Sequence, residues 1–286
     1  EAMLLEVEGA LKKHATRYRS ATALLARETY KAQILAEELL QDPDLKEEAQ
    51  LLKAKAAVAN EQYIAARDTL RPLLIGKRAN DGYLPSASEI DPAEIRWLLA
   101  EGARLRGSSN ASISAYWKIW TANPTSSYSS LAEEKLIALG ERVPNSTTEK
   151  GRAYIKARAR TFRKLQLHKE ALKLLDLLPQ PNDQASLRKF AYYTFSAKDY
   201  PRTLKVFQSL EDATDEDLFH MALASVRSGD YEGSESYYKQ ILELFPKSRR
   251  ADTASFKLGY LEYDLGNLDE ALPLFSAHLL RFPNSR

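Results

Sequence analysis

Apolar residues recur along this chain at intervals of three and four, the spacing that places them on one face of an α-helix. The clearest runs are Leu258, Leu261 and Leu265, and Leu272, Phe275 and Leu279. Val and Ile are few beside Leu and Ala, and 11 glycines with 12 prolines are too few for a sheet protein rich in turns. The pattern predicts an all-α fold whose amphipathic helices bury their apolar faces against one another.

The C-terminal part of the sequence contains one pattern twice. Six positions recur after 37 residues: Met221, Ala222, Gly229, Ser234, Tyr238 and Pro246 are matched by Leu258, Gly259, Gly266, Ala271, Phe275 and Pro283. The recurring Gly predicts a tight turn between two antiparallel helices, because glycine adopts the left-handed conformation that ends a helix. The small residue after it lets the second helix approach the first, and the proline ends the second helix.

These positions resemble the marked positions of the tetratricopeptide repeat, a helix-turn-helix unit of about 34 residues. The two copies then begin at Asp215 and Asp252, and weaker copies begin near Glu47, Arg152 and Gln184. A looser helix pair covers residues 91–106 and 111–122. The sequence therefore predicts an α-solenoid of about six tetratricopeptide-like helix pairs over residues 47–286, irregular in 47–150 and clearer in 152–286.

The remaining segments are less regular. Residues 1–46 are predicted to form a long helix, or two helices broken near Ser20. Residues 76–91 are the one long turn-rich stretch, which is typical either of a mobile connection or of a contact loop. The last residues, 282–286, repeat the lead-in that residues 245–249 provide to a helix. We therefore expect a further helical element after Arg286, since a solenoid needs a cap.

Composition narrows the class of protein. With 44% hydrophobic and 28% charged residues, the chain has the balance of a soluble folded protein. The 41 Lys and Arg residues against 39 Asp and Glu residues do not provide the basic surface that nucleic-acid binding requires. No stretch is apolar enough for a transmembrane segment, and the chain opens without a basic-then-apolar leader, so we expect any signal peptide to have been removed already. The absence of Cys excludes disulfides and thiolate nucleophiles.

Motifs that would carry catalysis are missing from the sequence. The four histidines, at 14, 168, 220 and 278, are far apart and are expected to be ordinary helix residues rather than metal ligands. No phosphate-binding glycine loop or nucleophile elbow occurs. The acidic runs 211–212 and 215–217 precede a predicted helix, where carboxylates favour the positive end of the helix dipole. We therefore predict no catalytic residue, metal site or cofactor within this chain.

A ligand-binding groove is one hypothesis that the repeat register suggests. The concave side of a tetratricopeptide array is lined by the first helix of each repeat. In the repeat that begins at Arg152, four cations occupy the groove positions: Lys156, Arg160, Arg163 and Lys164. In the following repeats, aromatic residues occupy them: Tyr192, Phe195, Phe219, Phe256, Tyr260 and Tyr263. Such a groove suits peptides or sugars that carry carboxylates. The alternative is a solvated helix face for the cations and a core position for the aromatic residues.

Several phrases resemble the superhelical region of soluble lytic transglycosylases. They are residues 115–126 (AYWKIWTANPTS), residues 131–140 (LAEEKLIALG), and the Gly-Asp-Tyr and Phe-Pro-x-Ser-Arg signals near the end. The resemblance implies a periplasmic protein whose helical ring supports a lysozyme-like domain that cleaves peptidoglycan glycan strands. The family's E-S-x-F motif is imitated by residues 235–238 (ESYY), but no G-L-M-Q follows. Because Tyr238 holds the packing position that Phe275 repeats, we reject residues 235–238 as a catalytic motif.

Two functions are compatible with this sequence. The first is a non-catalytic superhelical scaffold that positions peptidoglycan or a partner for a catalytic domain outside residues 1–286. The alternative is a self-contained tetratricopeptide adaptor of the cell envelope that binds a protein partner. A catalytic role of the full-length protein, the oligomeric state and the closure of the solenoid are left open by the sequence.

Overall fold

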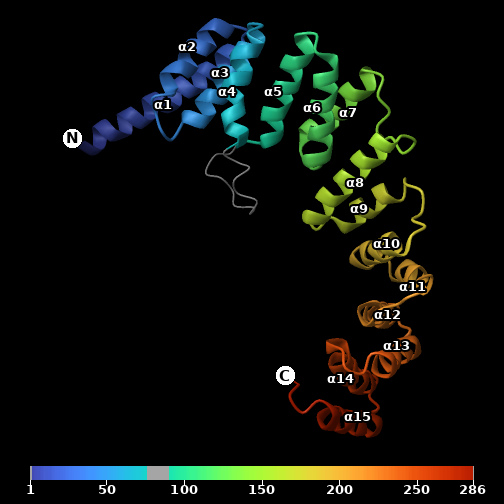
Figure 1. Cartoon of the computed structure of the whole chain (residues 1–286). Coiled ribbons are helices and arrows are strands. Elements are labelled where there is room, and N and C mark those ends of the chain that lie inside the picture. The colour runs from blue at the N-terminus through green and yellow to red at the C-terminus, as the bar shows by residue number, and fades with distance from the viewer. Residues whose placement is uncertain (1, 76–89, 286) are drawn as a thin grey trace. The chain divides into compact units, whose positions relative to one another are not determined.

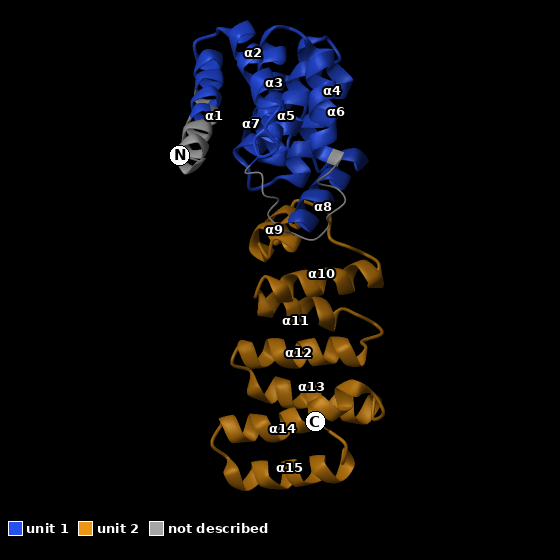
Figure 2. Cartoon of the chain, turned by 90° about the vertical axis from the view of Figure 1, so that its left-hand side faces the viewer, with its two compact units in different colours: residues 1–161 blue, residues 162–286 orange. Residues whose placement is uncertain are grey.

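The structure, a computed structural model, describes residues 2–75 and 90–285. These residues form fifteen α-helices and no strand, which confirms the predicted all-α, tetratricopeptide-like solenoid fold (Figure 1). The chain divides into two compact units, residues 1–161 and residues 162–286 (Figure 2). None of the helices in the described ranges is both long and apolar enough to cross a membrane.

Unit 1 is a succession of helices in which each packs against the next from α1 to α7. In addition, α1 contacts α3, α3 contacts α5 and α5 contacts α7, as expected when helix pairs stack. The helices are α1 (Ala2–Leu25), α2 (Thr29–Leu39), α3 (Lys46–Ala59), α4 (Tyr63–Ile75), α5 (Pro92–Leu105), α6 (Ser109–Ala122), α7 (Ser127–Ala138) and α8 (Glu149–Lys164), the last of which ends in unit 2.

The N-terminal segment forms two helices, which is one of the two predicted alternatives, but the break between them lies at another position. The break between α1 and α2 lies at residues 26–28, where Arg27 adopts a φ of 61°, and not near Ser20. Ser20 is buried, and its Oγ donates a hydrogen bond to the carbonyl oxygen of Ala32 at 2.9 Å, so this polar residue joins the two helices. Leu39 of α2 packs with Leu52 of α3 in one core cluster, and both helices belong to unit 1.

The part of unit 1 nearest α8 contains its largest buried side chains. Trp117 and Trp120 of α6 meet edge to face, with ring centroids 5.4 Å apart, and Tyr154 of α8 stacks on Trp117 at 4.3 Å.

Helix α7 falls between the helix pairs that the sequence predicts, and the repeat analysis missed it. The turn-rich segment 76–91 lies outside the described residues except at its end, where Asp91 caps α5 by accepting a hydrogen bond from the Ala93 N–H at 2.8 Å.

Unit 2 contains the two clear repeats. Its helices are α9 (His168–Leu175), α10 (Gln184–Ser196), α11 (Tyr200–Gln208), α12 (Asp215–Arg227), α13 (Tyr231–Leu244), α14 (Arg249–Asp264) and α15 (Leu268–Arg281). From α10 to α15 they stack as successive antiparallel rungs (Figure 2). The pairs α12–α13 and α14–α15 are the two copies related by 37 residues, as predicted.

The repeat residues have the roles that the sequence indicates. Gly229 and Gly266 adopt φ angles of 81° and 82° in the turns, a region where a side chain would be strained. Gly259 allows α14 and α15 to approach closely, because a Cβ there would lie 2.9 Å from the ring of Phe275. Ser234 and Ala271 are buried at the matching contacts, and α13 and α15 end just before Pro246 and Pro283.

Candidate functional site

The four cations predicted to line a groove lie on one helix, α8, and all four are exposed. Lys156, Arg160 and Lys164 follow one another at intervals of four and therefore share one helix face. The guanidinium of Arg163 lies 5.4 Å from the ring centroid of Tyr193. The helix thus presents a cationic surface, while the prediction that it binds an anionic ligand stays a prediction.

Arg158, which sequence analysis passed over, lies on the buried side of the same helix. Its guanidinium stacks on the ring of Trp120 at 4.4 Å and donates hydrogen bonds to the Trp120 carbonyl and to Ser129 Oγ, the latter at 2.7 Å. Burial lowers the pKa of Arg158 to about 10, against the opposing charge of Glu133. Arg158 therefore fastens α8 to α6 and α7, and it remains charged at neutral pH.

The aromatic residues predicted for the groove separate into two sets. In the first set, Tyr192 and Phe195 are half-buried and Phe219 is only 7% exposed. Phe219 packs against Tyr238 at 5.9 Å and is covered by the guanidinium of Arg250 at 4.3 Å. Phe219 therefore packs in the core, where Arg250 of α14 covers it, and the prediction that it contacts a ligand stays a prediction.

Tyr192 belongs to a polar network around a buried carboxylate. Asp217, at the start of α12, accepts hydrogen bonds from the Tyr192 hydroxyl at 3.0 Å and from Arg188 Nε at 2.8 Å. It also forms a capping box with Thr214, so the predicted capping role of the acidic residues 215–217 is confirmed at this position. Burial raises the pKa of Asp217, but the hydrogen bonds from Thr214, Arg188 and Tyr192 outweigh it and leave the pKa below its ordinary value.

The second aromatic set is exposed. Phe256, Tyr260 and Tyr263 lie on successive turns of α14 and are 42%, 40% and 55% exposed. Their ring centroids follow one another at 6.2 Å, from Phe256 to Tyr260 and from Tyr260 to Tyr263. Lys257 Nζ lies 4.8 Å from the ring centroid of Tyr260. Three large aromatic rings thus form a continuous row on the surface of unit 2.

The repeat relationship shows why this row is unusual. The residues 37 positions earlier are Phe219, Leu223 and Val226. Phe219 is buried and Leu223 is half-buried in the core that α12 and α13 form with α14, and Val226 is half-buried. The second helices of the two pairs, α13 and α15, show the same contrast between a buried residue and its exposed repeat equivalent. Leu242 of α13 packs against that core, whereas its equivalent in α15, Leu279, is 66% exposed.

We call Phe256, Tyr260, Tyr263 and Leu279 the α14–α15 face. Scattered apolar residues on a protein surface are ordinary, whereas a contiguous apolar patch marks an interaction site. Phe256, Tyr260 and Leu279 are the repeat equivalents of Phe219, Leu223 and Leu242, which share a core with residues of α14. The face therefore has the side-chain arrangement of a helix-binding surface.

The histidines at 220 and 278 and residues 235–238 lie in packed parts of unit 2. His220 lies between the rings of Tyr192 and Phe195, each at 4.8 Å, and His278 is buried beneath Phe256 and Phe282. No group of three His, Asp or Glu side chains in the described ranges could hold a metal ion. Residues 235–238 lie within α13, and Tyr238 is buried in the core, where burial raises its pKa to about 12. The packing position that the sequence predicts for Tyr238, inside the second helix of a repeat, is confirmed.

Comparison with known proteins gives similar structures but no family. No protein-family model matches the sequence, and no curated protein matches it. The TPR2AB domain of yeast Sti1, in its pHSP90 complex, aligns at 13% identity over 96% of this chain and 92% of that chain, with a TM-score of 0.35. The P58(IPK) TPR domain aligns at 15% identity over 96% and 85%, with a TM-score of 0.35. The apo form of the quorum sensor NprR from B. thuringiensis aligns at 15% identity over 98% and 78%, with a TM-score of 0.32.

At these identities and TM-scores, the ligands of those proteins say nothing about this one. The description of this chain as a tetratricopeptide-like helical repeat stands on its own helix pairs and their 37-residue recurrence. None of the three structures is a lytic transglycosylase.

Proposed function

We propose that this protein is an adaptor that binds a protein partner, and that its α14–α15 face binds an amphipathic α-helix. The observation that carries the proposal is the contrast between Phe219, covered by α14, and its repeat equivalent Phe256, which is exposed. Aromatic residues in such positions contribute a large share of binding energy at protein interfaces.

The chemistry of the partner helix follows from α14 itself, which occupies the equivalent surface of the preceding repeat. It contributes Ala251, Ala254 and Leu258 to the core shared with α12 and α13. These residues are three and four apart and lie on one helix face, with small side chains that allow close approach. A partner helix with small residues and a leucine at that spacing fits the α14–α15 face in the same way.

The test uses a synthetic peptide with the sequence of residues 249–264 as the probe. Fluorescence anisotropy of the labelled peptide measures its affinity for the full chain. The double variant Phe256→Ala/Tyr260→Ala is expected to bind it at least fivefold more weakly, because both rings are lost from the centre of the face. Tyr231→Ala, which removes an exposed aromatic ring from α13, serves as the control and should leave the affinity unchanged.

Equal affinity of the double variant and the unchanged protein would contradict the proposal. Sedimentation of the chain alone tests for another occupant. A dimer that dissociates in the double variant would assign the face to a second copy of this chain and not to a different protein.

A periplasmic location and a role beside peptidoglycan are a further proposal, which only the resemblance of residues 115–126 and 131–140 to lytic transglycosylases supports. Of the two sequence-based alternatives we favour the adaptor function, because the exposed residues of the α14–α15 face are apolar and aromatic.

A further inference from the structure

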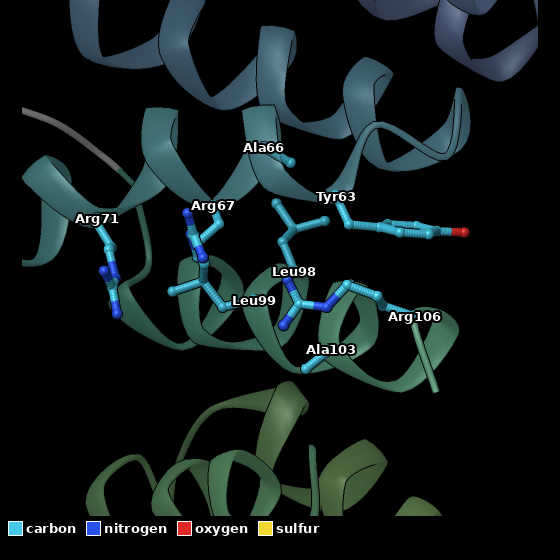
Figure 3. A pocket seen from close by; sticks show the side chains of 9 residues that line it. Tyr63, Ala66, Arg67, Arg71, Leu98, Leu99, Ala103 and Arg106 are labelled. Atoms are coloured by element: carbon cyan, nitrogen blue, oxygen red, sulfur yellow. The ribbon is translucent and has the colours of Figure 1, made fainter. Parts of the chain in front are cut away.

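A second candidate site lies in unit 1, between α4 and α5. A cavity of ≈ 190 Å³ opens there, lined by residues of both helices and by Arg106, which follows α5 (Figure 3). Its apolar surface comes from Ala66 of α4 and from Leu98, Leu99 and Ala103 of α5. The cavity is large enough for one apolar side chain but not for a folded element.

Three guanidinium groups surround this apolar floor. Arg67 and Arg71 extend from α4, and Arg106 lies across the cavity from Arg71, beside Tyr63 (Figure 3). No carboxylate belongs to the lining residues. The cavity therefore combines an apolar interior with a rim of a single charge sign.

Most of this positive charge is uncompensated among the described residues. Arg67 forms an ion pair with the neighbouring Asp68 at 2.9 Å, whereas Arg71 and Arg106 form no ion pair with any side chain in residues 12–74 and 90–285. By contrast, Arg104, which directly follows the lining residue Ala103 in the sequence, is paired with Glu101 at 2.7 Å. Like charges on one rim repel one another, and an anionic ligand would relieve that repulsion.

We propose that this cavity binds an internal acidic segment of a protein partner, in which an apolar side chain is flanked by two carboxylates. The proposal rests on the adaptor function and adds a second contact to it. In an extended peptide, alternate residues point to one side. A sequence of the form acid–x–apolar–x–acid therefore places one apolar side chain in the cavity and a carboxylate on each side. Guanidinium groups bind carboxylates through two parallel hydrogen bonds, a geometry that lysine cannot supply.

The probe is a labelled peptide with the core Glu-Ser-Leu-Ser-Glu, acetylated and amidated so that it carries no terminal charge. Its affinity for the full chain is measured by anisotropy at low and at physiological salt. The double variant Arg71→Ala/Arg106→Ala is expected to bind at least tenfold more weakly. Both residues are exposed, so truncation should leave the fold intact, which circular dichroism checks.

The matched control is Lys118→Ala/Arg142→Ala, which removes the same charge from two exposed positions outside both candidate sites. It should leave the affinity for the probe unchanged. If Lys156→Ala/Arg160→Ala loses binding and the cavity variant retains it, the proposal is overturned and the cations of α8 become the site. Equal binding by all of these proteins also overturns it, because the cavity then contributes nothing.

Two peptide variants test the chemistry of the ligand. Gln in place of Glu removes the charges, and Ser in place of Leu removes the apolar side chain; each change should weaken binding at least tenfold. If the peptide with Ser in place of Leu binds as tightly as the original probe, the apolar side chain contributes nothing. The same conclusion follows if inorganic phosphate displaces both peptides at the same concentration. In either case the cavity is a simple anion site and the peptide assignment is wrong. The variant Phe256→Ala/Tyr260→Ala, which alters the α14–α15 face, should bind the acidic probe as tightly as the unchanged protein. A failure of the cavity proposal is therefore distinguishable from a failure of the proposed function.

Discussion

Residues that hold equivalent positions in the two C-terminal repeats have different surroundings. Phe219 and Phe256 are the same residue type at the same repeat position, yet Arg250 covers the first and leaves the second exposed. Arg250 is itself held by two hydrogen bonds to Glu216, at 2.5 and 2.7 Å. A single helix neighbour thus decides whether an aromatic side chain belongs to the core or to a binding surface.

Asp217 is a residue at which even a conservative change is expected to lower the stability of the fold. It is fully buried and accepts hydrogen bonds from Arg188, Tyr192 and Thr214. Asp217→Asn should lower the free energy of unfolding by about 2–3 kcal/mol at pH 7, because it removes a buried charge from its hydrogen-bond donors. Urea unfolding measures this difference. Asp212→Asn is the control, since Asp212 pairs with the same Arg188 at 3.0 Å but is exposed, and it should change the stability by less than about 0.5 kcal/mol.

The effect of Asp217→Asn should also depend on pH. The pKa of Asp217 is lower in the folded protein than the ordinary value of about 3.9, so its contribution to stability is present above that value and is lost as the pH falls through the folded pKa. The difference between the two proteins should therefore shrink below about pH 4. A difference that stays constant down to pH 3 would show that the carboxylate does not carry the effect.

At the scale of elements, α8 has two sides with different roles. Its exposed side carries the cations that the sequence indicates, and its buried side carries Arg158, whose guanidinium lies against Trp120 and Ser129. A charge count along the sequence does not distinguish the two sides. The helical period does, because Arg158 falls between Ile155 and Ala159, which are both fully buried.

Arg158→Ala is expected to lower the free energy of unfolding by about 2–3 kcal/mol, because buried acceptors on α6 and α7 lose their donor. Arg160→Ala, on the exposed side of the same helix, should change it by less than about 0.5 kcal/mol. Thermal unfolding of both variants measures the contrast. Equal effects would mean that Arg158 does not fasten α8 to α6 and α7.

At the scale of the whole molecule, stacked helix pairs draw stability from their neighbours rather than from one central core. Helices α13 and α15 test this, since each has 14 residues and they occupy equivalent repeat positions. Helix α13 is flanked by α12 and α14, whereas α15 packs against α14. We expect backbone amides of α15 to exchange with solvent faster than those of α13 in hydrogen–deuterium exchange. Similar protection of both helices would show that unit 2 opens as one cooperative block.

Much of the fold could be predicted from local chemistry. The spacing of leucines places the helices, and Gly229 and Gly266 place the turns, because glycine adopts their φ angles without strain. One of the two alternatives that the sequence left open placed a break near Ser20, but this residue lies inside α1. Its hydrogen bond to Ala32 is a contact between helices, which local pattern does not contain. Helix α7 was not predicted because the search for repeats looks for helices in pairs, and α7 lies between two predicted pairs.

The candidate sites depend far more on tertiary structure. The sequence by itself determined a repeated helix pair, its close contacts through Gly259 and Ala271, and the helix face on which each aromatic residue lies. Only the tertiary structure decided that Phe256 is open while Phe219 is covered, and that Arg71 and Arg106 meet across one apolar cavity. The physical reason is that helical period fixes the direction of a side chain around its own axis, whereas burial and charge pairing depend on which other helix lies against that side.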